Sequence, residues 1–200
     1  MKDELFLRGE KVPMTKEAVR ALALAKLELH RASHLIDIGA GTGSVSIEAA
    51  HTVTFIALKP GLLTGKARDV VGTLHHNALQ LLDENRQHFA CGNIEILPGE
   101  APMVITERAD AIFMGGSGGR LDELIDWSWQ QLYPGGRLVM TFILQENLNA
   151  ALDYLRLKGI EQVDCLQLNV SSLTALGSGH YFKPNNPVFV IACQKEENHG

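Results

Sequence analysis

The chain has 200 residues, of which 46% are hydrophobic and 20% are charged, which is enough for a single globular domain over residues 1–200 with a substantial core. Its formal net charge of −5 and its pI near 5.9 argue against bulk attraction to nucleic acid or to an anionic membrane. No apolar run approaches the length of a membrane span, and the N-terminal residues lack the apolar core of a signal peptide. We therefore expect a cytoplasmic protein with neither a nucleic-acid nor a membrane partner.

Three cysteines, Cys91, Cys165 and Cys193, lie far apart in the sequence and form no C-x-x-C pair. This spacing argues against a disulfide framework and against a metal site. We expect all three to be small, buried apolar residues.

Apolar spacing predicts an alternation of helices and strands. A helix is expected over 15–29, with Thr15 as its N-cap, followed by a buried strand over 35–38. Later elements are expected at 53–58 (strand), 74–89 (helix), 94–97 (strand), 110–114 (strand), 121–132 (helix), 137–144 (strand, after a turn at Pro134-Gly135-Gly136) and 146–158 (helix). Two β-rich segments, 166–170 and 187–193, then follow without a helix between them. The link over 177–186 suits an antiparallel hairpin with a long loop.

Glycines at every second position follow the first predicted strand, in Asp37-Ile38-Gly39-Ala40-Gly41-Thr42-Gly43. Glycine allows the backbone to turn at positive φ and to come close to a ligand, and the helix that follows offers unpaired N–H groups. The dinucleotide pattern G-x-G-x-x-G fails in both frames, because its last position falls on Ser44 or Ser46. The remaining pattern, D-x-G-x-G-x-G, resembles the first motif of Rossmann-like methyltransferases that use S-adenosylmethionine.

That resemblance implies an α/β fold, a class I methyltransferase sandwich whose mostly parallel seven-stranded sheet carries an antiparallel C-terminal hairpin strand. In such sheets ligands bind beyond the carboxyl ends of the strands. We therefore expect residues 39–43, 99–102 and 114–120 to share one crevice.

Five segments narrow the resemblance, and they occur in this order: Thr-Lys-Glu-Ala-Val-Arg at 15–20, the glycine loop at 37–43, Pro-Gly-Glu-Ala-Pro at 98–102, Ala-Ile-Phe-Met-Gly-Gly-Ser-Gly-Gly at 111–119, and His-Tyr-Phe-Lys-Pro at 180–184. Together they resemble the decarboxylating cobalt-precorrin C-15 methyltransferases of cobalamin synthesis. The likeness covers nearly the whole chain apart from the atypical residues 51–79.

The resemblance implies methylation of cobalt-precorrin-6B at C-15, coupled to loss of carbon dioxide from the acetate side chain at C-12. It also implies an assembly of identical subunits, with a tetramer suggested. The residues that it assigns to S-adenosylmethionine are Thr15, Asp37, Gly39, Ala40, Gly41, Thr42, Gly43, Glu100 and Ala101. Thr15 could donate to the methionine carboxylate or simply cap a helix, and Glu100 could accept from the adenine amino group or be a solvated loop residue.

A tetrapyrrole substrate is wide, flat and rich in carboxylates. The small residues Gly116, Ser117 and Gly118 would give it room, and Arg120 and Lys183, with Lys16 or Arg20, could supply positive charge. His180 and Tyr181 are candidate proton donors, or else they pack the hairpin.

One segment departs from the methyltransferase pattern. The second predicted strand normally ends in an acid that holds the ribose hydroxyls, but here it ends Ile56-Ala57-Leu58-Lys59-Pro60. Residues 61–77 look like an insertion, and Asp69 is its only carboxylate. We expect weaker cofactor binding than in relatives.

Three alternatives remain open from the residues. The chain could methylate another substrate, such as RNA or a small metabolite, or it could be an inactive cofactor-binding protein. It could also be a serine hydrolase, because Gly115 to Gly119 matches G-x-S-x-G, with Ser117 as nucleophile and Asp126 or Asp153 then His180 downstream. A phosphate-loop likeness at 61–67 lacks one spacer residue and the metal-binding hydroxyl, so we discount it.

Overall fold

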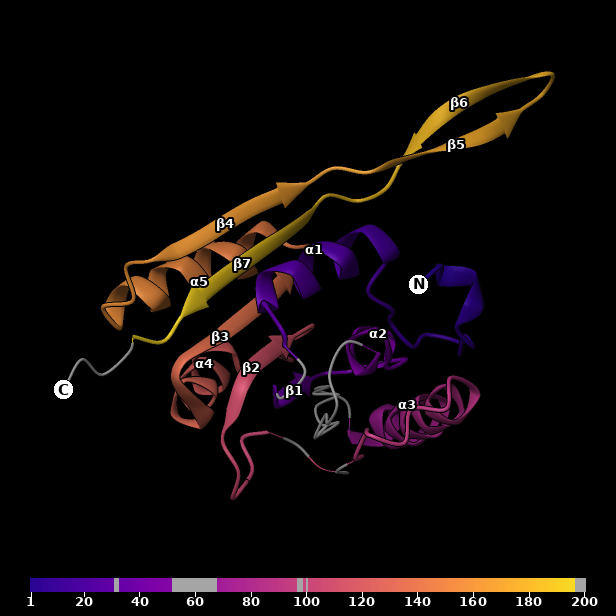
Figure 1. Cartoon of the computed structure of the whole chain (residues 1–200). Helices are drawn as coiled ribbons and strands as arrows, with labels where there is room; N and C mark the ends of the chain where they lie inside the picture. Colours follow the sequence, from indigo (N-terminus) through magenta and orange to yellow (C-terminus); the bar gives the residue numbers. More distant parts are fainter. Residues whose placement is uncertain (31–32, 52–67, 97–98, 100, 197–200) are drawn as a thin grey trace.

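The computed structural model describes residues 1–30, 33–51, 68–96, 99 and 101–196, and only the backbone of 68–76. Five described strands form its main sheet in the order β1-β2-β3-β7-β4 (Figure 1). Their bounds are β1 Leu35–Ile38, β2 Ala109–Met114, β3 Leu132–Phe142, β4 Val163–Leu168 and β7 Val188–Gln194. β1, β2 and β3 are parallel neighbours, whereas β7 runs antiparallel to both β3 and β4. All strands but β7 therefore point the same way, as predicted for a mostly parallel sheet.

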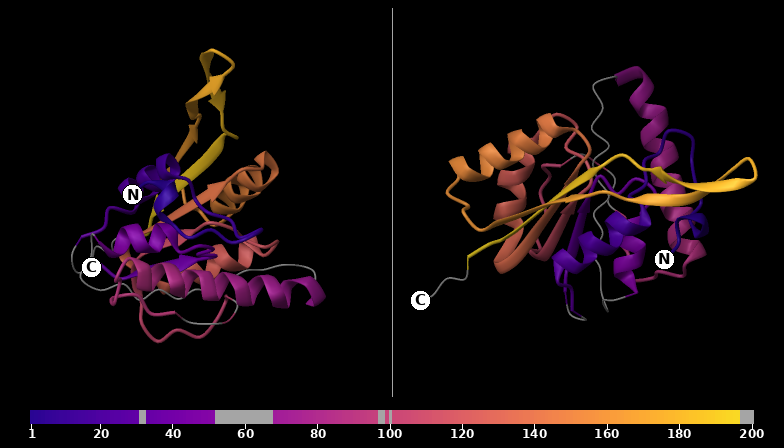
Figure 2. Two further views of the ribbon diagram at one scale, coloured as in Figure 1. Left: turned by 90° about the vertical axis from the view of Figure 1, so that its right-hand side faces the viewer. Right: turned by 90° about the horizontal axis from the view of Figure 1, so that it is seen from above.

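Helices cover both faces of this sheet (Figure 2). α1 (Glu17–Leu27) packs on one face together with α2 (Ser44–Ala50), and α4 (Leu121–Gln131) packs on the other with α5 (Gln145–Leu157). α3 (Arg68–His88) lies beside α2 at the edge of the molecule (Figure 1). Since strand side chains alternate between faces, Ile36, Ile112 and Leu138 join the core under α4 and α5, while their sequence neighbours face α1.

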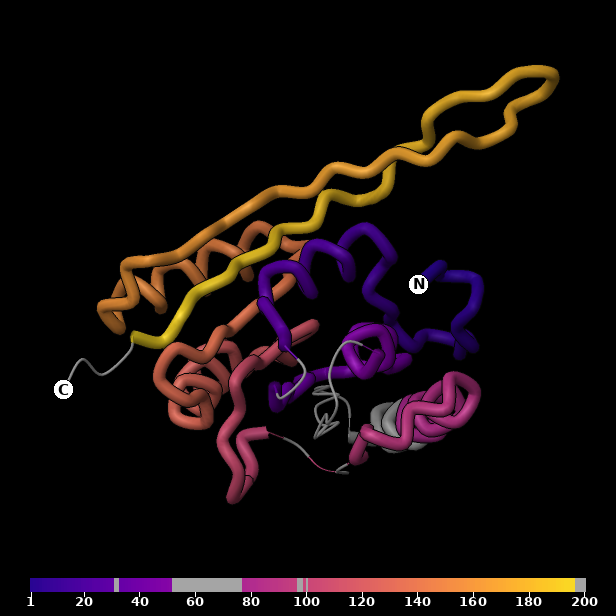
Figure 3. Tube along the Cα trace, viewed as in Figure 1, coloured from indigo at the N-terminus to yellow at the C-terminus, as the bar shows by residue number. Residues whose placement is uncertain are grey.

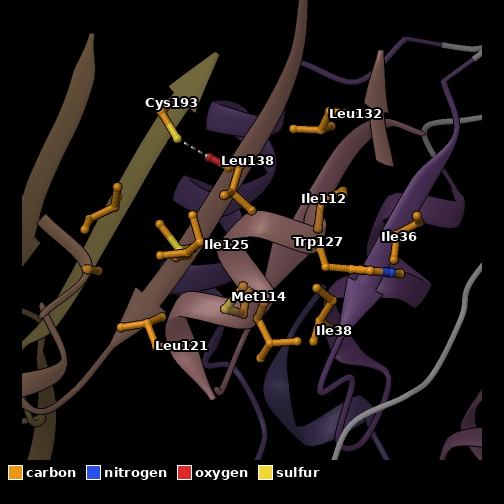
Figure 4. Close-up of a cluster of buried hydrophobic side chains, with 14 of the residues drawn as sticks. Ile36, Ile38, Ile112, Met114, Leu121, Ile125, Trp127, Leu132, Leu138 and Cys193 are labelled. Carbon is orange, nitrogen blue, oxygen red and sulfur yellow. Dashed lines mark hydrogen bonds between the residues drawn. The ribbon is translucent and has the colours of Figure 1, made fainter. Parts of the chain in front are cut away.

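The core beneath α4 follows from the helix's apolar spacing. Leu121, Leu124 and Ile125 recur at the interval that places them on one face, and all three are buried in the core. Figure 4 shows Leu121 and Ile125 among the side chains of this core. The indole N–H of Trp127 is satisfied within this core, because it donates to the carbonyl of Met103 at 2.9 Å. This packing fixes the start of α4, and with it the glycine-rich loop that precedes it.

A long two-stranded arm leaves the body of the molecule between β4 and β7 (Figure 3). It is an antiparallel hairpin of β5 (Ser171–Leu176) and β6 (Gly179–Pro184). The predicted antiparallel pairing of the last two sheet strands is confirmed by β4 and β7. The link between them, predicted as a loop, is instead this hairpin, on which Leu173 and Phe182 are exposed.

Four local predictions are wrong. α1 begins at Glu17, with Lys16 rather than Thr15 as its N-cap, and its first N–H is instead satisfied by Asp3 Oδ1 at 2.9 Å. Among 94–96, the described part of the strand predicted at 94–97, only Ile94 pairs, as a single bridge. The turn at Pro134-Gly135-Gly136 lies within β3 rather than before it. It forms an irregularity in the pairing with β2, between Leu132, which pairs with Ala109, and Arg137, which pairs with Ala111. Cys165 is exposed, whereas Cys91 and Cys193 are buried as expected.

Several predictions lie outside the described residues. These are the strand at 53–58 with its Lys59-Pro60 end, the segment 61–67, and Glu100. α3 begins at Arg68, so the second half of the predicted insertion is helical. In the part of the chain that the structure describes, no helix combines the length and apolar character needed to span a bilayer.

Candidate functional site

The glycine loop joins the end of β1 to the start of α2, and its backbone shape requires glycine. Gly41 and Gly43 have φ of +55° and +78°, which side-chain-bearing residues rarely adopt. A Cβ on Gly41 would lie 2.5 Å from the carbonyl oxygen of Pro13, and one on Gly43 would overlap the side chain of Leu82. The loop is therefore held between the N-terminal segment and α3, with no room for larger residues.

Asp37, the acid of the motif, is fully buried on the α2 side of β1. Its Oδ2 accepts from the hydroxyl of Ser46, and the backbone N–H of Ser46 also donates to the carboxylate. Burial raises the pKa of this carboxyl to about 7, against the lowering effect of the Ser46 hydrogen bonds. Asp37 Oδ1 and the nearby Thr42 Oγ1 are buried without a hydrogen-bond partner among the described residues. Such orphaned groups fit a loop that receives a polar ligand.

Asn85 of α3 braces the outer side of the glycine loop. Its side chain is completely buried; Nδ2 donates to the carbonyls of Thr42 at 3.0 Å and Leu7 at 3.1 Å, and Oδ1 accepts from the N–H of Leu7 at 2.8 Å. One amide therefore ties α3, the N-terminal segment and the loop together.

Arg20 of α1 braces the segment that contains Thr15. Its guanidinium is fully buried, with Nε 2.8 Å from Glu48 Oε2 and Nη1 2.7 Å from Asp3 Oδ1. Nη1 also donates to the carbonyl of Thr15 at 2.6 Å, and Nη2 donates to that of Met1 at 2.5 Å. The Thr15 carbonyl also accepts from the hydroxyl of Ser44 at 3.4 Å, which links it to the residue directly after the glycine loop. Because every donor of Arg20 points inward, it cannot serve the predicted basic patch.

A cleft of about 310 Å³ opens beside this segment, at the carboxyl ends of β2 and β3. Three pieces of chain make its walls, together with one residue each of α1, α5 and β7. The lining residues are Pro13, Met14, Thr15, Lys16, Val19, Gly115, Gly116, Ser117, Thr141, Phe142, Ile143, Leu144, Asn147 and Val188. Pro13 accepts a 3.4 Å hydrogen bond from Thr42 N–H, so one wall of the cleft is bonded to the glycine loop.

The three segments predicted to share a crevice are neighbours. The N–H of Gly115 donates to the carbonyl of Ile38 at 3.1 Å, which joins the ends of β2 and β1. Arg120 Nη1 donates to the carbonyl of Ala101 at 3.2 Å, which joins the 99–102 segment to the start of α4. Ala101 is buried, and Gly118 lies in the turn between Ser117 and α4. These contacts make the three segments neighbours, although only Gly115, Gly116 and Ser117 among their residues line the cleft.

The predicted substrate residues do not all meet at the cleft. Gly116 and Ser117 line it, but Arg120 does not, and its Nε and Nη2 lie 3.1 Å and 2.5 Å from Glu123 Oε2. Lys183, His180 and Tyr181 lie on β6, in the arm that projects from the body (Figure 1). The structure of one chain therefore does not bring the hairpin residues to the cleft.

A serine hydrolase triad is not assembled either. Ser117 lines the cleft, but Asp126 is engaged by the hydroxyl of Tyr154 at 2.9 Å and by the ammonium of Lys158 at 2.8 Å. Asp153 pairs with a neighbouring arginine on the exposed face of α5. With His180 on the projecting arm, no acid and base stand behind Ser117 among the described residues.

Sequence reasoning missed two residues that shape the site, Arg20 as a brace and Asn85. A signal for Asn85 was present, since Ala78, Leu81, Leu82 and Asn85 share the i, i+3, i+4, i+7 spacing of one helix face. A polar amide on a buried face must find hydrogen-bond partners.

The chain forms a mostly parallel sheet with helices on both faces. Its glycine loop and its cleft lie at the carboxyl ends of the strands. Together these features define a Rossmann-like methyltransferase. The family model described as precorrin methyltransferase domain matches residues 6–195. The chain belongs to this family.

Known relatives cover the whole chain. It is 71% identical over 199 residues to a Salmonella typhimurium protein named cobalt-precorrin-6B C(15)-methyltransferase (decarboxylating), covering 100% of this chain and 98% of the relative. It is 35% identical to a Saccharolobus solfataricus protein named probable cobalt-precorrin-6B C(15)-methyltransferase (decarboxylating), covering 96% and 94%. A solved precorrin-6y C5,15-methyltransferase from Geobacter metallireducens superposes with a TM-score of 0.83 at 29% identity, covering 98% and 97%.

Proposed function

We propose that this protein transfers a methyl group from S-adenosylmethionine to C-15 of cobalt-precorrin-6B and removes carbon dioxide from the acetate at C-12. The proposal rests on a glycine loop that is hydrogen-bonded to Pro13, a residue in the wall of the cleft. It is supported by the 71% identity to the Salmonella typhimurium protein named for this reaction. The loop and the cleft are adjacent, as a donor and an acceptor in direct transfer must be.

The residues present fit S-adenosylmethionine at the glycine loop. The loop leaves two buried polar atoms, Asp37 Oδ1 and Thr42 Oγ1, without partners among the described residues. Gly39, Ala40 and the glycines after it would lie against the methionine and ribose, Thr15 would meet the methionine carboxylate, and Ala101 and Glu100 would lie beside the adenine.

The bound cofactor supplies a methyl group on an already activated sulfonium, so the protein's main task is alignment, an effect that can contribute up to about 7 to 11 kcal/mol. Arg20 and Asn85 serve this task indirectly, since each fixes a piece of backbone that bounds the loop. Gly116 and Ser117 leave the approach to the loop open for a flat ring system.

Decarboxylation breaks the bond between the acetate methylene and its carboxyl carbon, and the electron pair passes into the conjugated macrocycle. The apolar lining from Phe142 and Val188 favours this step because a charged carboxylate is less stable where water is scarce. The proton that completes the reaction is assigned to His180 or Tyr181.

The proposal includes a homo-oligomer of the single domain over 1–200, with a tetramer as the expected form, and a seven-stranded sheet. The exposed Leu173 and Phe182 on the arm support self-association. The burial of β1 is evidence for further strands in the sheet. All residues of β1 are buried, although no described strand pairs with its outer edge. Residues 53–58 and the region of Ile94 are the expected sources.

A direct assay tests the activity. Purified protein is incubated with methyl-labelled S-adenosylmethionine and cobalt-precorrin-6B, and the product is examined by mass spectrometry. We expect a gain of one methyl group and a loss of one carbon dioxide. Labelled RNA in place of labelled precorrin, or no product from either, would overturn the proposal.

A further inference from the structure

Lys16 and Asn147 are polar residues of the cleft to which the proposed function gives no role. Lys16 is the N-cap residue of α1, and Asn147 lies in the first turn of α5, so the two residues line the cleft from different elements. We propose, on the basis of the proposed function, that these two residues form a carboxylate subsite that holds one acidic side chain of the substrate, which the product retains.

The charge of the cleft favours an anionic group. Among the described residues that line it, Lys16 is the only one with a charged side chain, and none is a carboxylate. The Lys16 ammonium has one described ion-pair contact, Asp3 Oδ2 at 3.8 Å, with its side chain 55% exposed. The other oxygen of Asp3 already accepts from Arg20 and from the N–H of Glu17. A long, solvated contact of this kind is weak, so the ammonium can pair with a ligand instead.

Two side chains that can donate hydrogen bonds line the same cleft as Lys16. The side chains of Asn147 and Ser117 make no hydrogen bond within the described part of the chain, although Ser117 is only 9% exposed and lines the cleft. A carboxylate accepts several hydrogen bonds at once, and an ammonium together with an amide or hydroxyl is a suitable donor set.

The size of the cleft decides how the macrocycle enters. About 310 Å³ lies at the lower end of the range for pockets that enclose a drug-sized ligand. A four-ring tetrapyrrole with its acidic side chains is larger, so only one edge enters and the rest stays outside. Ile143 and Leu144, which are 62% and 58% exposed at the cleft, provide an apolar surface for the ring that remains outside.

The held carboxylate is one that the reaction leaves in place. An ion pair from Lys16 to the departing carboxylate would stabilise the ground state more than the transition state, in which that charge moves into the ring, and would slow the step. Lys16 and Asn147 are therefore substrate-positioning residues, and they contact substrate and product alike.

The test compares Lys16→Gln, Asn147→Ala and the double variant with the matched control Lys2→Gln. Lys2 lies in the same N-terminal segment, is exposed, and has a similarly long contact of 3.9 Å to Glu4, but it does not line the cleft. We expect KM for the precorrin to rise about tenfold in each single variant, as loss of one charge-assisted contact implies, with a larger rise in the double variant. Product dissociation constants should rise in parallel, while affinity for S-adenosylhomocysteine and the melting temperature stay at wild-type values. Asn147→Asp, which opposes a carboxylate with a like charge, should raise KM further than Asn147→Ala.

An unchanged KM in the double variant, with active wild type, would overturn the subsite and leave the proposed function intact. A raised KM with unchanged product affinity would overturn the assignment to a retained carboxylate. Inactive wild type would overturn the proposed function and the subsite together.

Discussion

Arg20 offers the sharpest test of how the site is held in shape. Arg20→Met keeps most of the side-chain stem but removes the guanidinium, and with it the contacts to Glu48, Asp3 and the Thr15 carbonyl. The substitution therefore frees the backbone of Thr15 in the wall of the cleft, while Arg20 itself is not one of the residues that line the cleft.

The magnitude follows from the exposure of the two carboxylates. Removing one partner of a fully buried ion pair destabilises a protein by about 3–5 kcal/mol. Here the side chains of Asp3 and Glu48 are 30% and 20% exposed, so both can regain water after the substitution. We expect a loss of about 2–3 kcal/mol, which for a chain of this length lowers the melting temperature by about 4–12 °C.

Thermal unfolding and calorimetric titration with S-adenosylhomocysteine measure the two consequences separately. Arg156→Met is the matched control, because Arg156 is 79% exposed and its pair with Asp153 lies on the surface of α5. Arg20→Lys should be intermediate, since an ammonium keeps the charge but not the planar fork of donors. Wild-type melting temperature and wild-type ligand affinity in Arg20→Met would refute the reasoning.

Three further outcomes can be checked on the same preparations. Gly41→Ala should abolish S-adenosylhomocysteine binding, because its Cβ would lie 2.5 Å from a backbone oxygen, whereas Gly92→Ala, with nothing within 4 Å, should bind normally in the same titration. Asn85→Asp should lower stability by about 2–4 kcal/mol in denaturant unfolding, because a carboxylate cannot donate to the two carbonyls that Asn85 serves; an unchanged midpoint would contradict this brace. Asp37 has a folded pKa of about 7 above its ordinary 3.8, so its buried charge destabilises the fold above pH 7 and this effect disappears as pH falls toward 4. Relative to Asp37→Asn, the ligand-free wild type should therefore lose stability between about pH 4 and pH 7, by at most about 4 kcal/mol, and show no further loss from this group at higher pH; parallel pH curves would exclude a buried charge.

The glycine loop could be predicted from the sequence because its requirement is local. Positive φ at Gly41 and Gly43 and a strand-to-helix change on either side leave a pattern within a dozen residues. The strands β1 and β2 and the helices α4 and α5 were predictable for the same reason, since their apolar spacing is continuous.

The start of α1 could not be predicted in this way. Thr15 is a good N-cap by residue type, but the first N–H of the helix, that of Glu17, donates its hydrogen bond to Asp3, which is 14 positions away in the sequence. Local propensity cannot anticipate a tertiary partner of this kind. The same holds for Arg20, whose partners come from the N-terminal segment and from α2.

The position of the hairpin residues makes the predicted proton transfer depend on the predicted oligomer. His180 and Tyr181 lie on β6, in an arm that projects away from the body of the chain (Figure 1). Neither residue lines the cleft. A role for either as proton donor therefore requires a second subunit to bring the arm to a cleft. Leu173→Ser with Phe182→Ser, which removes two exposed apolar side chains from the arm, should lower both the molecular mass in solution and the rate of product formation. A monomeric, fully active double variant would exclude both hairpin residues from proton transfer and leave that step to residues of the chain that forms the cleft.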